Sequence, residues 1–436
     1  MMNSAPSTTL VLGLGVAGRA ALSSLARRGI DVIAVDDDPG EEALALVDRL
    51  GVELLVAPGP SDWPAILAVV DEVVMAPGIR DTHPCHGAAR SAGVPIVDES
   101  DLAARWDDRP RCAVTGTNGK TTVVTLVVDM LERSGIRALP AGNTDTPLVA
   151  AIDDSEAEVF VVEASSFRLA HAASFSASPA AWLNFAPDHL DVHSDQASYQ
   201  NAKARIFEGI ADPSDAVANA ADPVVVARAP VGATFFGTPN APCRVDGKML
   251  VVDERPIVAI GDLPRALPHD LANALAAIAL AIRSGADPDS CRASLVQFSG
   301  LDHRITFVAE VAGVRYVDDS KATTPHATLT AMSGLPGAVL IAGGRNKGLS
   351  LMSLAAARPR AVVAIGESAD EIVAAFAGQC PVEVADSMES AVVAAGRFAS
   401  GRGSVLLSPA CSSFDWYDSY VERGLDFQRI VASLDG

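Results

Sequence analysis

Apolar runs of three to five residues recur along the chain, and glycine, proline or polar residues end most of them. In the first hundred residues the runs predict strands, separated by helical stretches, at 9–12, 31–35, 53–56, 72–75 and 95–97. The turn GLGVAG, residues 13–18, joins the first strand to a helix that we expect to extend to Arg28. The second strand runs into Asp36. Strand, glycine turn, helix, strand and acid in this order indicate a nucleotide-binding βαβ unit.

The rest of the chain continues the alternation of strands and helices. The polar segment 106–110, WDDRP, reads as a linker, and a second boundary lies near Leu301. Strands are expected at 111–114, 158–162 and 180–183, helices at 120–133, 198–207 and 269–283, and short β-runs at 215–262. Beyond residue 301, strands are expected at 314–317, 338–342, 361–365, 382–384 and 404–407. The pattern predicts an α/β protein with mainly parallel sheets and segments 1–107, 108–300 and 301–436.

Composition limits the possible partners and the compartment. The chain has 436 residues, of which 49% are hydrophobic, and a net charge of −21, which argues against nucleic-acid binding. No apolar stretch is long enough to span a bilayer, and the N-terminus does not resemble a signal peptide. The six cysteines show no paired spacing, so we expect neither disulfides nor structural zinc, and a cytoplasmic location.

Lysine is rare in this sequence, and its positions indicate chemistry. There are 28 arginines but only five lysines, namely Lys120, Lys203, Lys248, Lys321 and Lys347. Lysine supplies a compact charge and an amine that can become neutral and react, which a guanidinium cannot do. Four of the five lie in motifs, and Lys248 is expected to be a solvated surface residue.

The segment GTNGKTT, residues 116–122, follows a strand and opens a helix. Its backbone N–H groups and the helix dipole are suited to phosphates, Lys120 to the β- and γ-phosphoryl groups, and the Thr121 hydroxyl to Mg²⁺. Such a loop favours nucleotide binding over a simple glycine turn. The glycines at 13–18 suggest a second phosphorylated ligand, although a tight turn that only packs helix on strand remains an alternative.

Glu163 and His189 follow the strands at 158–162 and 180–183. Ligands of α/β sheets bind at the carboxyl ends of strands, so both positions fit Mg²⁺ coordination. Imidazole is an uncommon magnesium ligand, and a histidine such as His189, taken alone, is more often a loop or helix-cap residue.

The motifs together resemble those of the Mur ligases, and most closely the branch that adds glutamate. The matching segments, in family order, are GTNGKTT (116–122), AGNTDTP (141–147), EASSFRL (163–169), NFAPDHLD (184–191), YQNAKARIF (199–207), HDLANALAA (269–277), GLDHR (300–304), DDSKATT (318–324), GGRNKG (343–348) and LLSPACSSFD (406–415). They extend over nearly the whole chain.

The resemblance implies an α/β architecture of three domains. These are a Rossmann-like domain that binds the UDP-sugar, a central P-loop ATPase sheet with a smaller β-sheet, and a C-terminal Rossmann-like domain that closes over ATP and the amino acid. It also implies the reaction of a monomeric enzyme on small molecules: ATP phosphorylates the carboxylate of UDP-N-acetylmuramoyl-L-alanine (UDP-MurNAc-L-Ala), and D-glutamate attacks the acyl phosphate.

The resemblance further implies roles for individual residues. The catalytic residues would be Lys120, Lys203, His189, Lys321 and Lys347. Two Mg²⁺ ions would bind Thr121 and Glu163, and His189 and Lys203, with Lys203 carbamylated. ATP would contact Gly116, Thr117, Asn118, Gly119, Lys120, Thr121, Thr122, Asn273, Arg304 and Asp319. The other substrates would contact Gly15, Val16, Ala17, Asp36, Gly78, Asn143, Thr323, Ser413 and Tyr420.

Alternatives concern the third substrate and the class of protein. Asp37, Asp38 and the segment 416–420 depart from the family pattern, so L-glutamate or another amino acid is an alternative substrate. A nucleotide-sugar sensor that uses ATP as a switch is an alternative from another class, although a sensor need not keep Lys203 and Lys347.

Overall fold

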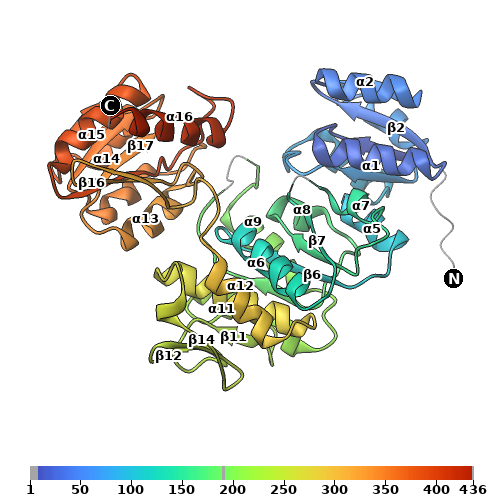
Figure 1. The fold of residues 1–436 in the computed structure, drawn as a ribbon. Coiled ribbons are helices and arrows are strands. Elements are labelled where there is room, and N and C mark those ends of the chain that lie inside the picture. Colours follow the sequence, from blue (N-terminus) through green and yellow to red (C-terminus); the bar gives the residue numbers. More distant parts are fainter. Residues whose placement is uncertain (1–7, 145, 189–191, 435–436) are drawn as a thin grey trace. The chain divides into compact units, whose positions relative to one another are not determined.

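The computed structural model describes residues 8–144, 146–188 and 192–434. The chain divides into two compact units, each described here by itself. One contains residues 1–185, 192–264 and 270–298, and the other contains 186–191, 265–269 and 299–436. Three sheets, shown in Figure 1, make up the α/β fold: two in the first unit and one in the second.

The N-terminal sheet is parallel, with strand order β3-β2-β1-β4-β5. Its strands are β1 (Thr8–Leu12), β2 (Asp31–Asp36), β3 (Glu53–Val56), β4 (Glu72–Met75) and β5 (Ile96–Val97). Its helices are α1 (Val16–Arg27), α2 (Glu41–Leu50), α3 (Trp63–Leu67), α4 (Pro84–Ala92) and α5 (Glu99–Trp106). The strand order reverses beside β1, and this is where open α/β sheets bind ligands.

The central sheet has nine strands in the order β14-β13-β12-β11-β10-β9-β6-β8-β7. They are β6 (Arg111–Thr115), β7 (Ala138–Gly142), β8 (Val159–Glu163), β9 (Ala180–Trp182), β10 (Ala216–Asn219), β11 (Thr234–Phe236), β12 (Cys243–Asp246), β13 (Met249–Val252) and β14 (Arg255–Ala259). Strands β7 to β12 pair in parallel, and β12, β13 and β14 pair antiparallel.

Helices pack against the central sheet and bury its apolar side chains. They are α6 (Lys120–Arg133), α7 (Leu148–Ala151), α8 (Ser166–His171), α9 (Gln196–Ala204), α10 (Pro223–Arg228), α11 (Pro268–Arg283) and α12 (Pro288–Gln297). One core joins α6 and α11 to β6 and β8 through Val123, Val127, Leu275 and Ile278, all fully buried. This packing fixes the start of α6, where the glycine loop ends.

The second unit holds a six-stranded sheet in the order β15-β16-β20-β17-β18-β19. The strands are β15 (Thr306–Val311), β16 (Val314–Asp318), β17 (Val339–Gly343), β18 (Ala361–Ile365), β19 (Val382–Val384) and β20 (Gly403–Leu407). The helices are α13 (Pro325–Gly334), α14 (Ala369–Ala375), α15 (Met388–Ala399) and α16 (Tyr420–Ser433). All pairs are parallel except β15 with β16.

A buried ionic network joins the N-terminal sheet to the central sheet. Glu99, at the start of α5, accepts the backbone N–H groups of Leu148 and Val149 at 3.2 and 2.7 Å and pairs with Arg168. Asp101 accepts three successive N–H groups at residues 173–175. Since a buried charge is tolerated only when it is paired and hydrogen-bonded, these contacts hold both sheets in one unit.

The predicted α/β class and parallel sheets are confirmed, and two strands were missed. Strand β7 contains Pro140 and was not predicted, because proline interrupts a strand pattern and is tolerated at a sheet edge, where β7 lies. The antiparallel edge strand β15 was also missed. The helix expected at 198–207 instead spans Gln196–Ala204 and continues as a 3₁₀ turn, Arg205–Phe207.

Within the described ranges, no helix has the length and apolarity that a membrane span needs.

Candidate active site

Hydrogen bonds and packing from neighbouring residues fix the conformation of the loop between β6 and α6. Asn184 clamps it from the end of β9: its carbonyl accepts the Thr117 N–H at 3.1 Å, and its side chain exchanges two hydrogen bonds with the Asn118 backbone at 2.9 and 3.0 Å. Gly119 has φ +89°, and a Cβ there would lie 2.5 Å from Asn273 Oδ1. Only glycine fits this left-handed, crowded position at the start of the helix.

Two lysines converge on this loop. Lys120 Nζ donates to the carbonyl oxygens of Gly116 and Thr117 at 2.9 and 3.1 Å. Lys203, on α9, is 1% exposed; its Nζ donates to the same Gly116 oxygen at 2.8 Å and lies 4.8 Å from the centre of the Tyr199 ring. The loop therefore gathers two lysine amines at one carbonyl, next to a helix N-terminus.

Glu163 ends strand β8 and is buried, with 3% of its surface exposed. Its Oε1 accepts from the Asn143 side chain at 3.3 Å. Within the described part of the chain its Oε2 is buried without a hydrogen-bond partner, and so is Thr122 Oγ1 in the first turn of α6. A buried carboxylate oxygen without a partner is costly, and a bound cation would satisfy it.

Three of the four predicted magnesium ligands lie on elements next to the glycine loop, and their roles stay predictions. Thr121, Glu163 and Lys203 belong to α6, β8 and α9, which surround the glycine loop. Glu163 and Thr121 offer the oxygen ligands that Mg²⁺ prefers. His189 lies outside the described residues, so its predicted role stays a prediction.

The N-terminal glycine turn places a second set of predicted residues at a helix start. Gly15 and Val16 are exposed at the N-terminus of α1, and Ala17 is buried. Gly78, with φ +96°, follows β4 in the neighbouring loop. Asp36 accepts the Leu14 N–H and, through its other oxygen, the Asp38 N–H at 2.9 Å, so its carboxylate also braces the turn.

In the second unit, Asp319 is buried where β16 ends. Its Oδ2 accepts from Ser408 Oγ at 2.8 Å. Burial raises the pKa of this carboxyl to about 7, although the Ser408 hydrogen bond and the Arg304 charge act in the opposite direction. The group therefore titrates near neutral pH, as active-site carboxylates often do.

Four of the remaining predicted residues of the second unit form two pairs, Lys321 with Tyr420 and Lys347 with Thr323. Lys321 Nζ lies 5.4 Å from the centre of the Tyr420 ring, at the first residue of α16. Lys347 Nζ donates to Thr323 Oγ1 at 3.4 Å. Ser413 is buried, and its carbonyl accepts the N–H groups of Trp416 and Tyr417.

Two positioning residues were not singled out from the sequence. Asn184 clamps the loop, and Tyr199 lies within hydrogen-bond distance of Thr117 Oγ1, at 3.2 Å. A signal for Asn184 was available, because it follows strand β9, adjacent to β6, at the edge where site residues gather. Tyr199 lies one helical turn from Lys203, so the two could have been assigned together.

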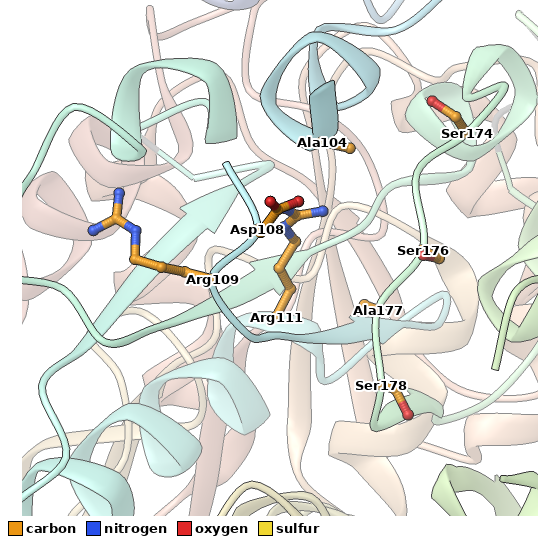
Figure 2. Close-up of a pocket in the computed structure, with 8 residues that line it drawn as sticks. All are labelled: Ala104, Asp108, Arg109, Arg111, Ser174, Ser176, Ala177 and Ser178. Carbon is orange, nitrogen blue, oxygen red and sulfur yellow. The ribbon is translucent and has the colours of Figure 1, made fainter. Parts of the chain in front are cut away.

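A cavity of about 300 Å³ elsewhere in the first unit holds none of the predicted residues. It is lined by Ala104, Asp108, Arg109, Arg111, Ser174, Ser176, Ala177 and Ser178. Figure 2 shows the Arg109 guanidinium pointing away from the serines, and it donates to the carbonyls of Ile152, Asp154 and Ala157. The cavity is therefore not part of the candidate site.

Family models match three successive parts of the chain. They describe the MurD-like N-terminal domain of Mur ligases at residues 7–98, the Mur ligase middle domain at 114–281 and the Mur ligase glutamate ligase domain at 303–411.

Curated proteins match over almost the full length. A UDP-N-acetylmuramoylalanine–D-glutamate ligase of Frankia casuarinae is 42% identical, over 98% of this chain and 94% of that protein. A protein of the same name from Nitrosococcus oceani is 34% identical, over 98% and 97%.

Solved structures match the fold. A pseudomurein peptide ligase type C from Methanothermus fervidus has a TM-score of 0.62 at 16% identity, over 98% of this chain and all of that one. MurF from Acinetobacter baumannii has a TM-score of 0.61 at 16% identity, over 97% and 90%.

The raised pKa of Asp319 predicts a pH-dependent stability. The folded-state pKa, about 7, exceeds the unfolded value near 4, so the stability that this group contributes is present below pH 4 and lost as pH rises to 7. Between pH 4 and 8, the free energy of unfolding of wild type should therefore fall by up to about 4 kcal/mol more than that of Asp319→Asn. Urea unfolding at several pH values measures this difference. Exposed Asp302→Asn is the control, and parallel curves for wild type and Asp319→Asn would contradict the assignment.

Proposed function

The chain belongs to the Mur ligase family, and from this premise we propose that it joins D-glutamate to UDP-MurNAc-L-Ala at the expense of ATP. The observation that carries the proposal is the full-length match, at 42% identity, to a protein named for this reaction. The arrangement of Lys120, Glu163 and Lys203 around the glycine loop supports it, since it provides the charges that phosphoryl transfer requires.

We assign the reaction's parts to the three segments of the chain. Residues 1–107 would bind the UDP-sugar, 108–300 would bind ATP, and 301–436 would contribute the amino-acid site and nucleotide contacts. The exposed turn at the start of α1 supports the first assignment, because a helix N-terminus favours phosphate. Gly15, Val16, Ala17, Asp36, Gly78 and Asn143 are the proposed acceptor contacts.

The reaction runs in two steps. A carboxylate oxygen of the alanyl group attacks the γ-phosphorus of ATP, and ADP leaves. The amine of glutamate then attacks the acyl-phosphate carbonyl, loses a proton, and the C–O bond to phosphate breaks. The products are an amide, ADP and inorganic phosphate, and one oxygen of the acceptor carboxylate ends in the phosphate.

The proposed role of the central residues is charge stabilisation and positioning. Lys120 neutralises charge that develops on the transferred phosphoryl group, while Gly116, Thr117, Asn118, Gly119 and Thr122 hold the phosphates and Asn273 contacts the nucleotide. Thr121 and Glu163 would bind one Mg²⁺, and His189 and Lys203 a second. A Mg²⁺ ion held by these residues would supply positive charge that offsets the negative charge of the phosphates.

Lys203 is the proposed carbamate. Its neutral amine would attack CO₂ and release one proton, which changes the side-chain charge from 0 to −1. Starting from the ammonium form, two protons leave and the charge changes from +1 to −1. The burial of this amine beside a carbonyl oxygen and a ring supports the idea, because a fully buried ammonium is costly and an anionic oxygen group there could bind metal.

Residues of the second unit are proposed to act on the nucleotide and the amino acid. Arg304 and Asp319 would contact ATP. Lys321, Lys347, Thr323, Ser413 and Tyr420 would hold glutamate and the transferred phosphoryl group. The same enzyme acting on L-glutamate is the second candidate, because the segment 416–420 departs from the family pattern. A monomeric state and a cytoplasmic location complete the proposal.

Phosphate release from ATP should depend on both the acceptor and D-glutamate. We expect turnover with UDP-MurNAc-L-Ala and D-glutamate, and background rates with L-glutamate, meso-diaminopimelate or no amino acid. Lys120→Ala should lose roughly a hundredfold or more in turnover, because one preorganised charge at the transition state is removed. Lys248→Ala, at an exposed lysine, is the matched control. Phosphate release that is as fast without any amino acid as with D-glutamate would contradict ligase chemistry. Turnover with L-glutamate but not with D-glutamate would select the second candidate.

A carbamate on Lys203 predicts that turnover depends on CO₂ and that an arginine at position 203 cannot replace the lysine. Lys203→Arg should lose at least about a hundredfold in turnover at unchanged fold, whereas wild type in CO₂-depleted buffer should regain activity on addition of bicarbonate. Lys248→Arg serves as control. Full activity of Lys203→Arg, with no response of wild type to bicarbonate, would exclude a carbamate.

A further inference from the structure

Three potential metal ligands converge at a place that the proposed reaction does not use. One ligand atom each of Asp81, His86 and His171 lies within 4.8 Å of the others. Asp81 lies in the loop before α4, His86 lies on α4 in the N-terminal part of the chain, and His171 is the last residue of α8 in the central part. The sequence separation shows that folding alone brings the two imidazoles together, and their rings stack with centroids 5.3 Å apart.

His86 presents a nitrogen that lacks a hydrogen bond. Within the described chain, its Nε2 is shielded from solvent and has no partner. A neutral imidazole whose proton lies on Nδ1 keeps the Nε2 lone pair available for a metal ion.

Without an ion, Nε2 of His86 is a buried polar atom that has no partner among the described residues. Buried polar atoms of this kind are rare in folded proteins, and a bound metal ion would satisfy this one.

Hydrogen bonds and a charged side chain surround the two imidazoles. Asp81 offers the carboxylate, and its Oδ2 also accepts the Ser194 N–H at 3.3 Å and lies 3.9 Å from His193 Nδ1. His193 is 3% exposed and hydrogen-bonded through Nε2 to Ser166 Oγ at 3.0 Å. His83 is nearby in sequence but caps α4, since its Nδ1 accepts the Cys85 N–H.

We propose that Asp81, His86 and His171 bind one divalent transition-metal ion of the zinc type. Two imidazoles and one carboxylate suit Zn²⁺ and Co²⁺, whereas Mg²⁺ and Ca²⁺ prefer sites made of oxygen ligands. In a tetrahedral zinc site, ligand atoms lie about 3.3 Å apart, so each side chain must move by about 1 Å to close the site. Water or His193 supplies the fourth ligand.

The ion would tie α4 to α8 and so cross-link the N-terminal and central sheets within the first unit. A ligand that binds only the folded chain stabilises it by mass action. The site shares no residue with the proposed magnesium sites, whose ligands include the oxygen donors Thr121 and Glu163. Its test therefore needs no ligase activity.

The test measures zinc bound to the full-length chain after dialysis, with millimolar Mg²⁺ present throughout. Wild type should retain one zinc more per chain than His86→Gln, His171→Gln or Asp81→Asn. In wild type, zinc at a hundredfold excess over its Kd should raise the unfolding temperature by roughly 3 °C or more, and the three variants should lose this shift. Their circular dichroism and unfolding temperatures in metal-free buffer identify any variant that misfolds.

Two matched variants distinguish this site from other zinc-binding positions. His83→Asn keeps a helix-capping side chain and should retain the zinc, because His83 is not a ligand. Glu163→Gln should also retain it, because Glu163 belongs to the proposed magnesium site. Wild type without zinc, equal zinc in wild type and all three ligand variants, or an equal loss in His83→Asn would each overturn the proposal.

Discussion

Two lysine side chains donate to one carbonyl oxygen, that of Gly116, and the site of the first unit is organised around this contact. Lys120 reaches it from the first turn of α6, and Lys203 reaches it from α9, which lies about eighty residues later in the chain. Two lysine amines at the N-terminus of a helix favour a negatively charged ligand. We propose that the phosphates of ATP are that ligand, and conversion of Lys203 to a carbamate would turn one of the two amines into a metal ligand.

The fold maintains this contact through interactions with the neighbouring loop residues and through the packing behind them. Asn184 and Tyr199 hold the loop from β9 and α9, and Asn273 on α11 leaves room only for glycine at position 119. Each element is anchored by the apolar core of the central sheet. The buried ionic network between Glu99 and Arg168 then fixes the N-terminal sheet, which carries the proposed acceptor site, to the same unit.

Much of the site could be predicted from sequence because its parts are local. The glycine loop, Glu163 and Lys120 follow strands or open a helix, so an apolar run and the polar residues after it locate them. Lys203 lies in the last turn of α9, and its role was given only by the resemblance to the Mur ligases. Other features depend on distant contacts. Pro140 hides the edge strand β7, the pKa of Asp319 depends on burial, and His86 and His171 are brought together only by the packing of α4 near α8. His189 is predicted from sequence alone.

The central claim is that the loop transfers a phosphoryl group to a carboxylate rather than to water. The most direct measurement uses UDP-MurNAc-L-Ala carrying ¹⁸O in its alanyl carboxylate, with ATP and D-glutamate, and determines the mass of the phosphate released. An acyl phosphate predicts one ¹⁸O atom transferred into each phosphate, because the C–O bond breaks when the amide forms. Phosphate free of label, released at the rate of amide formation, would contradict the account.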